Sequence, residues 1–178
     1  YGGGAGMLMK PNVISEMIDA AFVPNGLPIF YLSPQGEKFD QKLAKELVDM
    51  KGINLLCGRY EGIDERVFLE YNIRSISLGD FVLTSGDAAV FPMLDACMRL
   101  LPGVLGDEES VKEESFGMCE QYENLLEYPQ YTKPTEWRGH KVPDILLSGN
   151  HAKIEQWRLN AAEEKTKIAR PDLWDLYN

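Results

Sequence analysis

The sequence predicts an α/β fold with a largely parallel sheet, followed by a small helical region. Apolar runs at 28–32, 53–57 and 73–78 have the length and composition of strands. Helical patterns at 37–50, 62–72 and 91–101 alternate with them. Such alternation is typical of βαβ units, whose strands are parallel. The 178 residues, 44% of them hydrophobic, are enough for one domain and an appendage.

The first half of the chain supplies most of this pattern. PIFYL (28–32) is followed by SPQG (33–36), and Ser-Pro before Gly predicts a turn. In 37–50, Phe39, Leu43 and Leu47 recur at helical spacing, and Gly52 stands where a C-cap is expected. INLLC (53–57) is continuously apolar, as in a strand covered on both faces.

The second half is less regular. The helix predicted at 91–101 places Pro92 near its first turn, and Pro102-Gly103 ends it. Residues 106–135 are acidic and then rich in Pro and Tyr, which predicts an interdomain linker. Asn150 is the expected N-cap of a helix reaching about residue 164, and another helix starts near 170. We therefore expect an α/β domain over 1–105, the linker over 106–135 and a helical domain over 136–178.

The charge is unevenly distributed. The formal net charge is −10, which disfavours strong non-specific binding of nucleic acid. Residues 129–178, however, hold eight Lys/Arg and seven Asp/Glu, a net charge of +1. The C-terminal third is therefore the plausible region for a polyanionic partner.

Cysteine and histidine usage argues against several classes of site. Three cysteines without a CxxC pair disfavour a disulfide framework or zinc site, and two histidines disfavour a histidine-rich metal site. We expect no protein-bound metal and a reducing, cytoplasmic compartment. No apolar run approaches the ~20 residues of a membrane span, so we expect no membrane partner. Because the sequence opens on Tyr1 and not on Met, we also expect residues before it.

Three predicted strands end in loops of similar chemistry, at 31–36, 57–64 and 77–86. Ligands of open α/β sheets bind at the carboxyl ends of strands, and glycines let the backbone approach them. There is no Walker lysine and no GxGxxG, so a triphosphate clamp is not indicated. The glycine-rich opening, YGGGAGM, is either a flexible turn or a close approach of the backbone to a ligand.

Successive blocks of the chain resemble one family. They are YGGGAGMLMKP, YLSPQG, LLCGRYEGIDERV, SISLGDFVLTSGD, RLLPGVLG, ESF, YPQYTKPTEWRG and VPDILLSGNHAKIEQWR. In order and content they are similar to the bacterial tRNA (guanine-N1)-methyltransferases of the TrmD type. The resemblance implies a SPOUT-like α/β domain with a deep trefoil knot and a small all-helical C-terminal domain. It also implies a strand and helix before residue 1 and more helix after residue 178.

The resemblance further implies an activity. Family members transfer methyl from S-adenosylmethionine to N1 of the guanosine 3′ of the anticodon, as homodimers whose active site is shared between subunits. A requirement for Mg²⁺ is also suggested. The cofactor cradle carried over by similarity is Tyr31, Leu32, Ser33, Pro34, Gly58, Ser77, Leu78, Gly79, Asp80, Phe81, Val82, Leu83 and Gly86. Ser85, Ala89 and Phe81 replace residues more common in the family, namely glycine, proline and tyrosine.

The reaction places demands on side chains. N1 of guanine carries a proton and is a poor nucleophile until that proton is removed, so a carboxylate base is expected. A cation near O6 is expected as well, because it stabilises the negative charge that develops on the ring. The resemblance assigns Glu114 as the base, where an aspartate is usual, with Glu113 as the second candidate. Arg99 is the expected cation, and Glu61 is expected near the target base. Arg59, Lys133, Arg138 and His151 are expected to contact the RNA substrate, with Tyr131, Trp137, His140, Lys141 and Lys153 around them.

Two other functions remain open from the sequence. One is a methyltransferase of the same knotted class that acts on a ribose 2′-OH or another base, which would not need an acidic linker. The other is an RNA- or nucleotide-binding module without catalysis, which would need a stronger positive field than a net charge of −10 allows.

Overall fold

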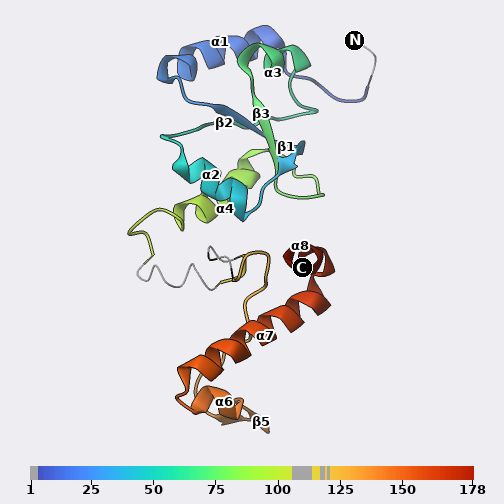
Figure 1. Ribbon diagram of the computed structural model, residues 1–178. Coiled ribbons are helices and arrows are strands. Elements are labelled where there is room, and N and C mark those ends of the chain that lie inside the picture. Colours follow the sequence, from blue (N-terminus) through green and yellow to red (C-terminus); the bar gives the residue numbers. More distant parts are fainter. Residues whose placement is uncertain (1–3, 106–113, 117–118, 120) are drawn as a thin grey trace. The chain divides into compact units, whose positions relative to one another are not determined.

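The computed structural model describes residues 4–105, 114–116, 119 and 121–178 (Figure 1). It divides the chain into two compact units, Tyr1–Leu105 and Gly106–Asn178. Each unit is described by itself. Within the described ranges, no helix is both long and apolar enough to cross a membrane.

The first unit is built on a three-stranded sheet. Its strands are β1 (Ile29–Lys38), β2 (Asn54–Leu56) and β3 (Arg74–Ser77), in the order β2-β1-β3, and both pairings are parallel. The helices are α1 (Pro11–Ala21), α2 (Gln41–Asp49), α3 (Glu65–Tyr71) and α4 (Asp87–Met98), with a short 3₁₀ turn η1 (Val23–Asn25). The predicted α/β architecture with a parallel sheet is confirmed.

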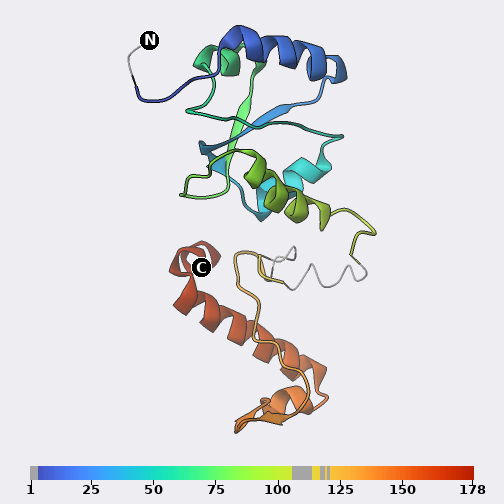
Figure 2. The same ribbon diagram turned by 180° about the vertical axis from the view of Figure 1, so that it is seen from behind.

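The sheet is covered on both faces (Figures 1 and 2). Successive side chains of β1 point to opposite sides, as strand geometry requires. Phe30 and Leu32 pack in a cluster with Met93 of α4, and α2 joins the same layer. Tyr31 packs on the other face in a cluster with Ile18 of α1, alongside α3. Because both faces are buried, the strands carry continuous apolar runs.

The turn predicted at SPQG is wrong, because β1 continues through it to Lys38. The ladder is irregular there, since Leu32 and Glu37 both pair with Ile76. Residues 33–36 are therefore the extra length of a large bulge. A Cβ on Gly36 would overlap the backbone of Ser75 and Ile76, so glycine lets the two chains approach closely.

Several helix boundaries differ from prediction. Helix α2 begins at Gln41, where the carboxylate of Asp40 accepts a 2.9 Å hydrogen bond from the backbone N–H of Leu43. It ends at Asp49, so Gly52 is not its cap. Helix α4 begins at Asp87, which places Pro92 in its interior and not in its first turn. Helix α1 was not predicted.

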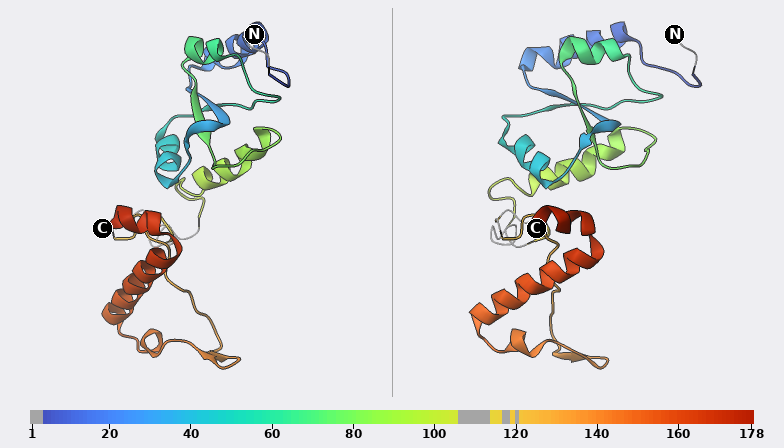
Figure 3. Two further views of the ribbon diagram at one scale, coloured as in Figure 1. Left: turned by 90° about the vertical axis from the view of Figure 1, so that its right-hand side faces the viewer. Right: turned by 45° about the vertical axis from the view of Figure 1, so that its right-hand side comes forward.

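The second unit combines helices with a hairpin that the all-helical prediction did not include. Strands β4 (Glu136–Trp137) and β5 (His140–Lys141) pair antiparallel. Helices α6 (Asp144–Leu147), α7 (His151–Ala169) and α8 (Pro171–Tyr177) follow. Asn150 caps α7 as predicted, accepting from the N–H of Lys153 at 3.2 Å, but the helix continues beyond 164. Figure 3 shows the extended segment before the hairpin beside α7.

Candidate functional site

A small hollow of about 60 Å³ lies between the bulge of β1 and the carboxyl end of β3. Residues of two predicted loops and the start of α4 line it together: Leu32, Ser33, Pro34, Ile76, Ser77, Leu78, Gly79, Phe81, Leu83, Ser85, Gly86 and Ala89. The structure thus brings most of the predicted cofactor residues to one place. Sequence reasoning missed Ile76, Ser85 and Ala89 as lining residues, although Ser85 and Ala89 were noticed as departures from the family.

Four residues predicted for the cofactor do not line this hollow: Tyr31, Gly58, Asp80 and Val82. Tyr31 is buried with its ring edge-on to Phe68, at 5.1 Å between centroids. A Cβ on Gly58 would overlap the hydroxyl of Tyr31. Gly58→Val would therefore disturb the core, and would not be a clean probe of ligand binding.

The 57–64 loop contacts Gly86, one of the residues that line the hollow. The N–H of Gly86 donates to the carbonyl of Gly58 at 3.2 Å, and a Cβ on Gly86 would lie 3.2 Å from the Cα of Cys57. The Ser77 hydroxyl donates to the carbonyl of Gly79 at 3.1 Å, and accepts from the N–H of Gly79 at 3.2 Å. These hydrogen bonds therefore fix the shape of the loops that follow β2 and β3.

An ion pair connects the 57–64 loop to the start of α4. The guanidinium of Arg59 donates to the carboxylate of Asp87 at 3.1 Å, with both side chains more than half exposed. The hydroxyl of Ser85 donates to the same carboxylate at 2.5 Å, and accepts from the N–H of Asp87 at 3.0 Å. Ser85 thus holds the carboxylate of Asp87, which in turn pairs with Arg59.

Glu61 lies against the glycine-rich opening. The Glu61 N–H donates to the carbonyl of Met7 at 3.0 Å, and the Met9 N–H donates to the carbonyl of Gly62 at 2.9 Å. Gly6 has φ +98°, and a Cβ there would lie 2.5 Å from Cγ of Glu61. Residues 4–9 therefore pack against the 57–64 loop and the Glu61 side chain. An approach of this backbone to a ligand stays a prediction.

The thiol and phenol near the site are not activated. Burial raises the pKa of the Cys57 thiol, and the negative charge of Asp87 raises it further. Burial also raises the pKa of the Tyr31 phenol, with a smaller contribution from Cys57. Both groups stay protonated at neutral pH, so neither is a nucleophile or base there.

The chemistry of the hollow fits part of a nucleoside cofactor. Its lining holds hydroxyls, backbone groups and apolar side chains, and no Asp, Glu, Lys or Arg. Such a lining suits adenosine attached to a zwitterionic amino acid. The volume of about 60 Å³ is smaller than the roughly 300–1,000 Å³ of typical ligand sites. The hollow in this structure therefore holds only part of such a cofactor.

The predicted catalytic residues are divided between the two units. Arg99 is half-buried at the C-terminal end of α4, outside the lining of the hollow. Glu61 is exposed on its loop in the same unit. Glu114 is half-buried and belongs to the second unit. Glu113 lies outside the described residues. The catalytic roles of Arg99, Glu61 and Glu114 all stay predictions.

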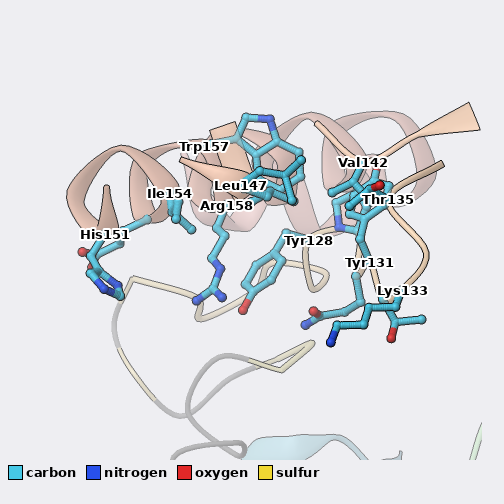
Figure 4. Close-up of a pocket in the computed structure, with 15 residues that line it drawn as sticks. Tyr128, Tyr131, Lys133, Thr135, Val142, Leu147, His151, Ile154, Trp157 and Arg158 are labelled. Carbon is cyan, nitrogen blue, oxygen red and sulfur yellow. The ribbon is translucent and has the colours of Figure 1, made fainter. Parts of the chain in front are cut away.

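The predicted RNA-contacting residues of the second unit fall into two places. Lys133 and His151 line a groove beside α7 (Figure 4). Arg138 sits at the hairpin turn with φ +51°, and its guanidinium lies 4.8 Å from the ring centroid of Trp137. Such a positive φ is uncommon for a residue other than glycine. The following Gly139 also has a positive φ, and two successive positive φ values are typical of a two-residue hairpin turn.

Metal ligands do not cluster in the part of the chain that the structure describes. No group of three or more His, Cys, Asp or Glu there could hold a metal ion. Cys57, Cys97 and Cys119 are all among the described residues, and none of them forms a disulfide.

Comparison with known proteins gives consistent matches over nearly the whole chain. The family described as tRNA (Guanine-1)-methyltransferase TrmD matches residues 1–176. A tRNA (guanine-N(1)-)-methyltransferase of Pelagibacter ubique is 52% identical over 178 residues, covering 99% of this chain and 75% of the relative. Proteins of the same name from Rhodospirillum rubrum and Clostridium beijerinckii are 50% and 53% identical, covering 99% and 98% of this chain and 72% and 70% of the relatives. The chain therefore belongs to the TrmD family of tRNA (guanine-1)-methyltransferases.

Proposed function

We propose that this protein transfers the methyl group of S-adenosylmethionine to N1 of a guanosine in tRNA, the one 3′ of the anticodon. The observation that carries the proposal is family membership over residues 1–176, with relatives of that name about 50% identical. The hollow between the β1 bulge and the end of β3 supports it, because its uncharged lining suits the chemistry of the cofactor. A deep trefoil knot in the first unit is part of the proposal.

The cofactor, when bound, supplies a methyl group on a sulfonium sulfur. Leu32, Ile76, Leu78 and Leu83 would pack against its apolar parts, since they line the hollow. The hydroxyls of Ser33 and Ser77 and the backbone around Gly79 would meet its polar groups. Because the lining has no charged side chain, the positive charge of the sulfonium is not stabilised by a counter-ion. Methyl transfer, which turns the sulfonium into a neutral thioether, is therefore favoured.

The protein must also prepare the guanine. Transfer forms a bond from N1 to the methyl carbon, breaks the carbon–sulfur bond, and releases the N1 proton to a base. We propose that Glu114 accepts this proton. We propose that Arg99 stabilises the negative charge that develops on the guanine ring. Glu61 and Arg59 lie on the loop after β2, beside the hollow, and are proposed to orient the base. A general base contributes about 10²–10⁴-fold in such reactions.

A divalent-ion requirement is a finer part of this proposal. Mg²⁺ keeps several waters and is held by one or two carboxylates together with substrate phosphates. Glu61 is exposed and could supply one such carboxylate. We further propose that the enzyme works in a reducing cytoplasm, in keeping with three described cysteines that form no disulfide.

Helix α4 supports a homodimer. Ala89 and Met93 are buried against the sheet, while Phe91, Leu94 and Met98 are 74%, 38% and 52% exposed. A helix that is apolar on both faces is normally buried on both. We propose that a second copy covers the exposed face and completes the active site. Leu94→Glu should then yield monomers in analytical ultracentrifugation and lose methyl transfer. A dimer of unchanged stability would contradict the assignment of this face.

Calorimetric titration with S-adenosylmethionine tests the cofactor site. Leu83 lines the hollow, whereas its neighbour Val82 is 85% exposed and does not. Leu83→Asp should weaken binding about tenfold or more, and the matched control Val82→Asp should leave affinity nearly unchanged. Equal effects of the two substitutions would remove the hollow as the cofactor site. No binding to the unmodified protein would instead favour an RNA-binding module.

A further inference from the structure

The second unit contains a groove that the methyl-transfer chemistry does not use. Its volume is about 700 Å³, and it lies between the extended segment 128–135 and helices α6 and α7 (Figure 4). This volume is within the roughly 300–1,000 Å³ of sites that hold small organic ligands. All of its lining residues belong to the second unit.

Aromatic rings form much of its wall. Tyr131 projects from the extended segment and Trp157 from α7, with 6.3 Å between ring centroids and 55° between planes. The two rings are therefore tilted and do not stack on each other. Tyr131 is 48% exposed, while Val142 and Ile154 supply apolar surface beside the rings. Such a wall suits a flat, apolar ligand with exposed faces.

Cationic side chains accompany the rings from two elements. Lys133 extends from the segment before the hairpin, and Arg158 from α7, where its guanidinium lies 4.8 Å from the ring centroid of Tyr128 (Figure 4). Glu155 is the only carboxylate among the lining residues, which are all described. The side chains that line the groove therefore carry a net charge of +1 with histidine neutral, whereas the net charge of the protein is −10. The ligand should thus be both aromatic and anionic.

We propose that this groove binds an unpaired nucleotide of the RNA substrate, with its base against Tyr131 and Trp157 and a phosphate near Lys133 and Arg158. The inference rests on the proposed function, which makes RNA the substrate. The nucleotide must be unpaired, because a base inside a duplex has both faces stacked. Aromatic side chains bind single-stranded bases with little regard to sequence. The groove would therefore hold the tRNA by a loop nucleotide other than the guanosine that is methylated.

Fluorescence of Trp157 reports directly on the groove. The chain has three tryptophans, so Trp137→Phe with Trp174→Phe leaves Trp157 as the only one. The probe is a short single-stranded oligoribonucleotide, compared with the same strand annealed to its complement. Saturable quenching by the single strand, and little by the duplex, is expected. Quenching by neither would overturn the proposal, and equal quenching by both would show phosphate binding without an unpaired base.

Substitutions separate this proposal from the function it rests on. Trp157→Leu and the more exposed Tyr131→Leu should each weaken single-strand affinity by roughly 5- to 150-fold, the usual effect of losing one stacked base. The control Trp174→Leu, in the same unit but outside the groove, should bind normally. S-adenosylmethionine affinity should be unchanged in all three.

Each outcome has one meaning. If the unmodified protein does not methylate tRNA, the proposed function fails. If it does, and both groove variants keep normal affinity for the single strand and for tRNA, the groove proposal alone fails. If the variants instead become monomeric in ultracentrifugation, the groove is a subunit contact, which also overturns the proposal. Tyr131→Leu remains informative if Trp157→Leu does not fold, because Tyr131 is half exposed.

Discussion

Replacement of Gly6 by alanine should disable Glu61 without touching the cofactor site. The Cβ of an alanine would lie 2.5 Å from Cγ and 2.7 Å from Oε1 of Glu61, so that side chain must move. Alanine must also adopt φ near +98°, and a left-handed conformation costs about 1–2 kcal/mol. We therefore expect the free energy of unfolding to fall by about that amount, measured by urea denaturation.

The effect on catalysis should be larger than the effect on stability. Displacement of a substrate-positioning group by about 1 Å can reduce a rate about 10²-fold. Single-turnover methyl transfer should therefore fall by about that factor in Gly6→Ala. S-adenosylmethionine affinity should not change, because Gly6 does not line the hollow. Gly4→Ala is the matched control, since a Cβ there meets no atom within 4 Å.

A double-mutant cycle gives the refuting result. In a Glu61→Ala background the clash is gone, so adding Gly6→Ala should reduce the rate little further. If Gly6→Ala costs the same factor in both backgrounds, the two effects are independent. Gly6 would then not act through Glu61, and the interpretation of the glycine-rich opening would be wrong.

Three further predictions concern other parts of the chain. Glu114→Gln should lower single-turnover methyl transfer by roughly 10²–10⁴ with cofactor affinity unchanged, and a near-normal rate would move the base elsewhere. Hydrogen bonds from Arg66 lower the pKa of Asp64 to about 2. The contribution of ionised Asp64 to the stability of the fold is therefore complete above its ordinary pKa of 3.8, and it is lost as pH falls through about 2. Asp64→Asn should therefore lower Tm at pH 7 but not below about pH 2, and a pH-independent difference would contradict this. Gly36→Ala should destabilise by about 1–3 kcal/mol in urea denaturation, because its Cβ overlaps the backbone of Ile76 and no side chain can move aside.

Strands and helices with strong periodicity were predictable from sequence. The apolar runs at 53–57 and 73–78 became β2 and β3, because apolar residues there are buried against helices on both sides. SPQG was misread, since its proline and glycine serve a bulge within β1 and not a turn that ends it. The start of α4 was predicted too late, because Pro92 was expected in the first turn and the helix instead has it in its interior.

The candidate site was predictable in part. Loop composition and family blocks together indicated the segments around Ser33 and Gly79, which line one hollow. The blocks could not show that Gly58 supports Tyr31, because that contact depends on which face of β1 the tyrosine occupies. The pairing of Arg59 with Asp87 was equally hidden, since 28 residues separate them in sequence.

Mapping the methylated atom on tRNA tests the central claim most directly. The protein would be incubated with unmodified tRNA and S-adenosylmethionine, and the nucleosides would be identified by mass spectrometry after complete digestion. The account predicts one methyl group on N1 of guanosine, located by fragment analysis immediately 3′ of the anticodon. A methyl group on a ribose 2′-oxygen, on another base or on another atom of guanine would contradict it.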